Sequence, residues 1–210
     1  SKSMEETLGL LAKFEDLGYK KLITTPHVMS DSYRNTPEII LDGLEKVREA
    51  ISDSEIAIQI DAAAEYYYDE GFLELIKQKK LLTFGDNYVL FEFAFLNQPS
   101  NIENLFFELL SSGYRPVLAH FERYVYWTGS VEKAVEFRAK GINIQMNLNS
   151  LTGHYGPEIR KQAELLVDNE LVDFVGSDCH RIQHLQMMEA HSTLSYFHKL
   201  TGLPLKNSTL

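Results

Sequence analysis

Residues 88–120 read YVLFEFAFLNQPSNIENLFFELLSSGYRPVLAH, and this stretch carries the pattern on which the fold is built. The apolar runs at 88–91 and 117–119 are typical of buried strands. Between them, apolar residues recur at helical spacing over 102–110. A strand, a helix and a second strand in this order predict a parallel strand pair joined by a crossover helix.

The same alternation runs along the rest of the chain. Further strands are expected near residues 22–25, 56–60, 142–146 and 172–175, and further helices near 8–17, 37–51, 71–78, 131–139, 157–167 and 185–200. This order predicts an α/β fold with a mostly parallel sheet. No linker rich in Gly, Pro or Ser divides the chain, so residues 1–210 are expected to form a single domain.

The predicted sheet is a closed or nearly closed β/α barrel with six visible strands. Each helix of such a barrel normally follows a strand, but the first predicted helix has none before it. We therefore expect that one strand is missing upstream of Ser1. Truncation at the N-terminus is the simplest explanation, and the C-terminus could be shortened as well.

The composition narrows the range of partners. The 210 residues include 30 acidic and 20 basic side chains, which give a formal net charge of -10. This charge disfavours nucleic acid and anionic membranes, although bound divalent cations would still allow a local phosphate site. A single cysteine and the lack of a recognisable signal peptide or membrane span predict a cytoplasmic protein.

Residues of metal-ligand type follow the ends of successive predicted strands. Because the carboxyl ends of barrel strands meet around one mouth, these side chains are expected to converge there. Imidazole and carboxylate ligands suit Zn, Mn or Fe, and bridging carboxylates favour a multinuclear site that clamps phosphate oxygens. Glu92 carries the most weight, because a carboxylate inside an apolar run is costly to bury alone. The six candidate ligands are His27, Glu65, Glu92, His120, Asp178 and His180.

Simpler interpretations stay open for the other five candidates. His27 is equally compatible with an ordinary loop position, and Glu65 with a surface carboxylate at a strand edge. His120 fits a core histidine, and Asp178 with His180 fits a local capping pair. The joint spacing of the candidates favours a shared site.

Arg123 follows His120 by three residues, which places a guanidinium beside the mouth for bidentate contact with phosphate. The alternative is a helix-start arginine that pairs with Glu122 or another carboxylate. Arg181 has the same ambiguity. We assign catalysis to His120 and Arg123, and substrate binding to Arg123, Tyr124 and Arg181.

Cys179 lies between Asp178 and His180 and raises the alternative of a thiol nucleophile. Side chains alternate along an extended strand, so the Cys179 thiol is expected to point away from its two neighbours. No glycine-rich phosphate loop follows it. Hydrolysis by a metal-activated water is therefore preferred.

Two groups of residues are given no function from the sequence. His154 and Tyr155 lie between glycines and could face the mouth, but the first interpretation is an ordinary loop. His184, His191 and His198 recur every seven residues in the last predicted helix, which indicates a solvated or interface stripe.

Six stretches together carry a family resemblance. They are TTPH ending at His27, AAEYY around Glu65, LFEF around Glu92, GYRPVLAHFERY from Gly113 to Tyr124, SLTGHYG from Ser150, and VDFVGSDCHR ending at Arg181. With these stretches the chain resembles the polymerase-and-histidinol-phosphatase (PHP) family, specifically its bacterial protein-tyrosine phosphatase branch of capsular and exopolysaccharide synthesis. The resemblance covers nearly the whole chain.

The resemblance implies a distorted seven-stranded β/α barrel with up to three metal ions, often manganese, with Fe, Zn or Mg as alternatives. It implies hydrolysis of phosphotyrosine on a bacterial tyrosine kinase, metal binding by the six candidate ligands, and phosphate contact by Arg123. Two features depart from the family pattern. Phe121 replaces a usual proline, and the His-x-His pair and following Asp of the family's first strand are missing, which agrees with the missing strand.

The leading functional hypothesis is a metal-dependent protein-tyrosine phosphatase. One alternative is a hydrolase of the same architecture that acts on histidinol phosphate or an amide bond. Another is a non-catalytic binding or regulatory domain that docks on a kinase or on a second copy of itself.

Overall fold

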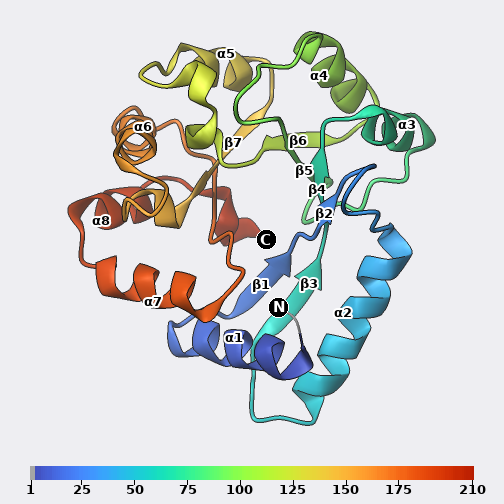
Figure 1. Ribbon diagram of the computed structural model, residues 1–210, viewed down its shortest axis with the longest axis vertical. Coiled ribbons are helices and arrows are strands. Elements are labelled where there is room, and N and C mark those ends of the chain that lie inside the picture. The colour runs from blue at the N-terminus through green and yellow to red at the C-terminus, as the bar shows by residue number, and fades with distance from the viewer. Residues whose placement is uncertain (1–2) are drawn as a thin grey trace.

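A computed structural model describes residues 3–210 as strands that alternate with helices (Figure 1). The strands are β1 (Lys21–Thr24), β2 (His27–Val28), β3 (Gln59–Ala62), β4 (Glu65–Tyr67), β5 (Tyr88–Glu92), β6 (Arg115–Leu118), β7 (Asn143–Asn147) and β8 (Phe174–Gly176). The helices are α1 (Met4–Asp16), α2 (Pro37–Ser52), α3 (Glu70–Gln78), α4 (Ile102–Ser111), α5 (Glu132–Ala139), α6 (Pro157–Asp168), α7 (Ile182–His191) and α8 (Ser195–Thr201). The predicted alternation is confirmed.

All pairings between these strands are parallel. The main sheet has the order β2-β4-β5-β6-β7-β8, and β1 pairs with β3 separately. Lys21 pairs with Gln59 and His27 with Glu65, so β1–β2 and β3–β4 keep one register. Pro26 lies at the break, where it has no N–H to donate to a sheet. The first two predicted strands are therefore each split in two, and the other four are confirmed.

The main sheet curls around an interior, and helices α3 to α6 lie outside it (Figure 1). Within residues 3–210 the sheet stays open between β2 and β8, which makes the described fold a curled half-barrel. The predicted fold class, a distorted parallel β/α barrel, is confirmed. The additional strand expected upstream stays a prediction.

Helices α1 to α6 agree with the predicted ones to within a few residues. The start of α2 shows why: the Thr36 side chain accepts a hydrogen bond from the Ile39 N–H, and Pro37 takes the first helical position. None of the helices in the described part of the chain has the length and apolar character needed to cross a membrane.

The prediction of one helix over 185–200 is wrong. Helix α7 ends at His191 and α8 begins after Leu194, whose backbone is extended with a ψ of 140°. His184, His191 and His198 therefore do not share one helix face, and His184 is buried.

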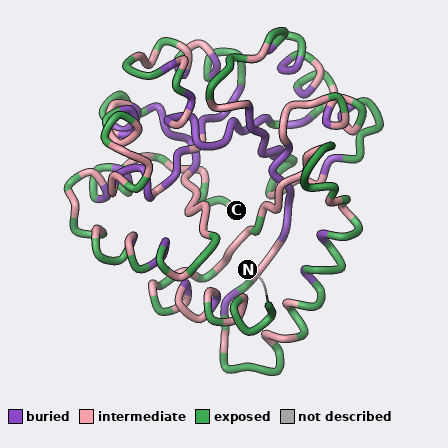
Figure 2. The backbone as a smooth tube through the Cα atoms, viewed as in Figure 1, coloured by how far each residue is buried: buried purple, intermediate pink, exposed green. Residues whose placement is uncertain are grey.

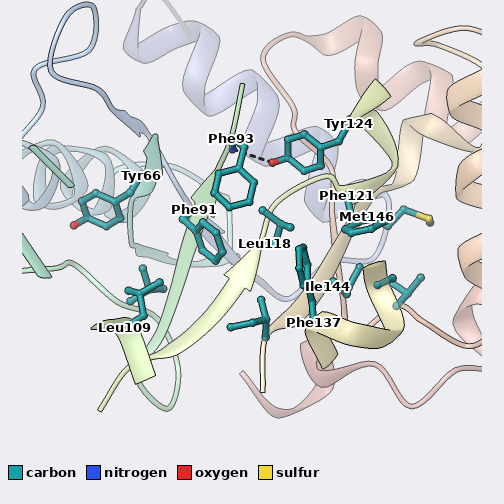
Figure 3. Close-up of a cluster of buried hydrophobic side chains, with 14 of the residues drawn as sticks. Tyr66, Phe91, Phe93, Leu109, Leu118, Phe121, Tyr124, Phe137, Ile144 and Met146 are labelled. Atoms are coloured by element: carbon teal, nitrogen blue, oxygen red, sulfur yellow. Dashed lines mark hydrogen bonds between the residues drawn. The ribbon is translucent and has the colours of Figure 1, made fainter. Parts of the chain in front are cut away.

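The sheet separates two apolar layers, and its central strands are the most buried part of the backbone (Figure 2). In β5, Val89 and Phe91 belong to the large outer cluster that includes the covering helices (Figure 3), whereas Tyr88 and Leu90 belong to a smaller cluster on the other face. Because side chains alternate along a strand, Glu92 continues the Tyr88 and Leu90 series. The strand therefore delivers the Glu92 carboxylate to the interior at its carboxyl end.

The last residues of the chain cover the free edge of β8. The Asn207 side chain accepts from the Val175 N–H at 2.8 Å and donates to the Val175 carbonyl at 3.0 Å, as a neighbouring strand would do. The backbone N–H of Lys206 donates to the Asp173 carbonyl at 2.9 Å. This segment ties the amino ends of the last strands together.

The buried Asp173 carboxylate is the centre of this network, and Asp173→Ala is expected to lower the free energy of unfolding by about 3 kcal/mol. Asp173 accepts two hydrogen bonds from Arg138, at 3.1 and 3.2 Å, and one from the Ile144 N–H at 2.9 Å. The substitution leaves those donors without an acceptor. Urea unfolding measures the effect, with Asp86→Ala, which removes an exposed ion pair to Arg115, as a control of less than about 1 kcal/mol. Equal urea midpoints for the two variants would contradict the expectation.

Candidate metal centre

Three side chains of ligand type meet at the ends of β2, β4 and β5. His27 opens β2, Glu65 opens the neighbouring β4, and Glu92 closes β5. One ligand atom from each lies within 4.8 Å of the others. The His27 Nδ1 atom lies 3.3 Å from Glu92 Oε1 and 4.0 Å from Glu65 Oε2, and the two carboxylates are only 6% and 7% exposed.

His120 joins this group from the end of β6. Its Nε2 atom lies 2.8 Å from Glu65 Oε1 and 3.3 Å from Glu92 Oε2. Burial alone would lower the pKa of His120, but hydrogen bonds to these carboxylates raise it to about 10. Burial would likewise raise the pKa of Glu92, but contacts with His120 and His27 lower it to about 2. Imidazole and carboxylate groups in this site thus stabilise each other's charged forms against the effect of burial.

The backbone at His120 turns sharply to bring the ring into this group. Its φ of 36° lies in the left-handed region, which is unfavourable for a residue with a side chain. The His120 N–H donates to Gln145 Oε1 at 3.1 Å, which holds the turn. Gly176 leaves room for Gln145, since a Cβ atom at Gly176 would lie 2.6 Å from Gln145 Nε2.

This donor set fits a divalent cation. Two buried carboxylates need positive charge close by, because an uncompensated buried charge is costly. The His27 Nδ1 atom is buried and makes no aligned hydrogen bond within the described residues, although it lies close to both carboxylates. Imidazole and carboxylate donors together suit Mn, Fe or Zn.

Asp178 lies next to this group, beyond the end of β8. Its φ of 46° is left-handed, so the extended backbone expected at Asp178 is wrong. Its Oδ2 atom accepts from Asn147 Nδ2 at 3.0 Å, Arg123 Nη1 at 3.2 Å and the Tyr155 hydroxyl at 3.3 Å. Burial raises the pKa of Tyr155 to about 12, so this hydroxyl carries its proton and donates. Three donors therefore fix the Asp178 carboxylate.

The Arg123 guanidinium lies at the same mouth between two aromatic rings. Its Cζ atom is 4.3 Å from the centroid of the Phe95 ring and 4.5 Å from that of Tyr155. The contacts with both rings and the ion pair with Asp178 restrict the movement of the guanidinium. Its remaining N–H donors are suited to an anion.

Of the two alternatives for the ion pair of Arg123, the structure shows the second, since Arg123 pairs with another carboxylate, Asp178, and not with Glu122. The Glu122 side chain is buried, and its Oε1 atom accepts from the Ser150 hydroxyl at 2.6 Å and the Asn147 N–H at 3.0 Å. Burial raises the pKa of the Glu122 carboxyl. Glu122 therefore holds the loop after β7 against the turn that carries Arg123.

His180 and Arg181 lie at the rim of the group. The His180 Nδ1 atom is 3.0 Å from the Asp178 carbonyl oxygen and 3.3 Å from Asp178 Oδ1, and its ring lies 6.4 Å from that of His27. The Arg181 Nε–H donates to His184 Nε2 at 3.2 Å. His180 thus adjoins the candidate ligands, whereas Arg181 is engaged by a neighbouring helix residue.

Tyr124, predicted to contact substrate, is fully buried in the outer cluster. Its hydroxyl accepts a hydrogen bond from the Phe93 N–H at 3.1 Å (Figure 3). A side chain without exposed surface does not reach a substrate. The prediction for Tyr124 does not fit this burial, and its ring instead packs behind His120, at 5.9 Å between centroids.

Cys179 packs into a second apolar cluster, with Leu11 and Phe14 of α1 and Leu185 of α7. Its thiol is thus directed away from the candidate ligands, as expected, although the backbone at Asp178 is left-handed and not the extended strand from which this direction was inferred. Burial raises the pKa of Cys179, which disfavours the thiolate needed for nucleophilic attack.

Three residues of this site received no role from the sequence: Phe95, Asn147 and Tyr155. Asn147 ends β7. The candidate ligands were selected because they follow the ends of predicted strands, and the same criterion could have included Asn147. For Tyr155 the sequence favours an ordinary loop position over one that faces the mouth, and the structure shows that it faces the mouth. Nothing in the sequence distinguishes Phe95 from its aromatic neighbours.

A curled parallel β/α sheet with imidazole and carboxylate groups at one mouth defines a barrel-like α/β protein with a candidate metal site. The chain matches the family described as capsular polysaccharide synthesis, CpsB/CapC, over residues 1–202, and it belongs to this family. The family predicted from sequence resemblance is confirmed.

Relatives and a solved structure agree with this assignment. The chain is 26% identical to CapC of Staphylococcus aureus over 215 residues, which are 100% of this chain and 84% of CapC. It is 28% identical to the tyrosine-protein phosphatase CpsB of Streptococcus pneumoniae over 187 residues, which are 86% of this chain and 77% of CpsB. The fold matches a crystal structure of YwqE from Bacillus subtilis and CpsB from Streptococcus pneumoniae, described as metal-dependent tyrosine phosphatases. The TM-score is 0.81 at 22% identity, over 98% of this chain and 90% of that chain.

Proposed function

We propose that the chain is a metal-dependent protein-tyrosine phosphatase that acts in capsular or exopolysaccharide synthesis. The observation that carries this proposal is the buried group of His27, Glu65, Glu92 and His120 beside the stacked Arg123. The group of four side chains provides donors for divalent cations, and Arg123 provides a fixed guanidinium for a phosphate. The names of the relatives CpsB and YwqE support the same activity.

Each side chain has a distinct task in this proposal. A bound divalent ion supplies Lewis-acid chemistry at the phosphoryl group and acidifies water. Arg123 binds the phosphate oxygens and stabilises the charge that builds up on them. Asp178 fixes the direction of the Arg123 side chain through their 3.2 Å ion pair. No covalent intermediate on the protein is needed, and the half-buried Cys179 thiol takes no part.

The finer details of the proposal are the metal, the partner and the compartment. We assign Mn2+ as the preferred ion and up to three ions per site, held by His27, Glu65, Glu92 and His120, together with Asp178 and His180. The substrate is a phosphotyrosine protein, in the first instance a bacterial tyrosine kinase of polysaccharide synthesis, in the cytoplasm. The mixed imidazole and carboxylate donors support Mn2+, with Fe, Zn or Mg as competitors.

Metal removal tests the function directly. Treatment with EDTA is expected to abolish hydrolysis of a phosphotyrosine peptide, and added Mn2+ is expected to restore it, because the ion supplies the Lewis acid. Cys179→Ser is expected to retain activity. Hydrolysis that survives EDTA but is lost in Cys179→Ser would overturn the mechanism. Faster turnover of histidinol phosphate than of the peptide would overturn the substrate.

A further inference from the structure

A short loop brings Tyr155 over the mouth of the barrel. The loop lies between β7 and α6. Within it, Gly153 and Gly156 flank His154 and Tyr155 and have φ values of 84° and 103°. Both angles lie in the left-handed half of backbone space, which glycine adopts without steric cost. These two turns fold the loop back, so that the half-buried Tyr155 reaches Arg123 and Asp178.

Tyr155 makes two different contacts with two different parts of the site. Its hydroxyl donates to Asp178 Oδ2 at 3.3 Å, and its ring lies 4.5 Å from the Arg123 Cζ atom. The Arg123 Cζ atom also lies over the Phe95 ring, 4.3 Å from its centroid. Arg123 also donates to the same Asp178 oxygen at 3.2 Å. Each of Tyr155, Arg123 and Asp178 therefore contacts the other two.

We propose that Tyr155 is a positioning residue with two separable roles: its hydroxyl orients Asp178 toward a bound metal ion, and its ring aligns Arg123 for phosphate. Partners that orient a metal-binding carboxylate raise metal affinity without touching the metal. A stacked guanidinium presents its donors in a fixed plane, so an anion binds without first ordering a long side chain. Both halves of this proposal rest on the metal and phosphate sites of the proposed function, but neither requires that the chain hydrolyses phosphotyrosine.

Two substitutions separate the roles. Tyr155→Phe deletes only the hydroxyl, so it is expected to raise the Kd for Mn2+ about tenfold and to leave phosphate affinity within about twofold. Tyr155→Leu deletes hydroxyl and ring, so it is expected to add about a tenfold loss of affinity for inorganic phosphate. Tyr196→Phe is the matched control, since it deletes a hydroxyl that bonds Asp168 on a remote helix.

Titration calorimetry measures both affinities, first with Mn2+ on chelator-stripped protein and then with inorganic phosphate on Mn2+-saturated protein. A structural role alone would lower the thermal midpoint and leave both Kd values unchanged. If Tyr155→Leu fails to fold, Phe95→Leu tests the role of aromatic contacts instead, because it removes the other ring that contacts the Arg123 guanidinium. Unchanged Kd values for Mn2+ in Tyr155→Phe, or equal phosphate affinities in the Phe and Leu variants, would overturn the corresponding role.

The same titrations distinguish this proposal from the proposed function. Neither measurement requires turnover, so a chain that binds Mn2+ and phosphate but leaves phosphotyrosine intact would refute the phosphatase alone. In an active protein, the two variants are also expected to differ in kinetics. At saturating Mn2+, Tyr155→Leu raises KM for a phosphotyrosine peptide, and Tyr155→Phe does not.

Discussion

Glu92→Gln is expected to reduce phosphotyrosine hydrolysis about 1000-fold and to lower the metal content of the purified protein. Glu92 lies 3.3 Å from both His27 Nδ1 and His120 Nε2, so its carboxylate is shared by two candidate metal ligands. Glutamine has nearly the same shape but carries no charge. A loss of about 4 kcal/mol of Lewis-acid stabilisation corresponds to about 1000-fold in rate.

The matched control is Glu103→Gln, which removes an exposed carboxylate that pairs with Lys140 on the outside of the barrel. It is expected to retain full activity and full metal content. Elemental analysis together with steady-state kinetics at saturating Mn2+ measures both quantities. A Glu92→Gln protein that holds metal and turns over substrate like the control would remove Glu92 from the site.

Most of the fold could be predicted because local and global signals agree. In the stretch 88–120, strand periodicity and helix periodicity alternate without conflict, and parallel pairing follows from the crossover helix. The split of the first two strands was not predicted, because a single Pro26 interrupts the hydrogen bonding without changing the register. The break between α7 and α8 was not predicted, although Ser192, Thr193 and Ser195 lie at it and such hydroxyl side chains disfavour a helix interior.

The site was only partly predictable for a physical reason. The strand ends brought His27, Glu65 and Glu92 together correctly, because Glu92 closes β5 and the other two lie three residues beyond the ends of β1 and β3. His120 and Asp178 instead depend on left-handed backbone angles of 36° and 46°, which propensity arguments do not foresee. Such strained positions persist only where surrounding contacts fix them, and they are common at functional sites.

The partners of these two residues explain how the strain is held, and also why the sequence did not reveal them. Gln145 holds the His120 turn through a hydrogen bond to its N–H, and Asn147 and Tyr155 hold the Asp178 carboxylate. Amide and hydroxyl side chains of this kind are abundant on any protein surface. Gln145, Asn147 and Tyr155 have a role because the fold directs their side chains toward His120 and Asp178.

Arg123→Lys is expected to lower kcat/KM for a phosphotyrosine peptide about 100- to 1000-fold while the protein keeps its metal. Lysine preserves the charge, but it cannot stack as a plane between Phe95 and Tyr155 or present two parallel donors to phosphate. Losing one fixed donor to a developing negative charge typically has an effect of this size.

The metal content of the purified protein distinguishes Arg123→Lys from Glu92→Gln. His27, Glu65 and Glu92 are untouched in Arg123→Lys, so elemental analysis is expected to find unchanged metal, whereas kinetics should find weak catalysis. Arg115→Lys, which alters an exposed arginine paired with Asp86, serves as the control. If Arg123→Lys lost metal and activity together, Arg123 would act by holding Asp178 for the ion. If it lost neither, the phosphate would be bound elsewhere at the mouth.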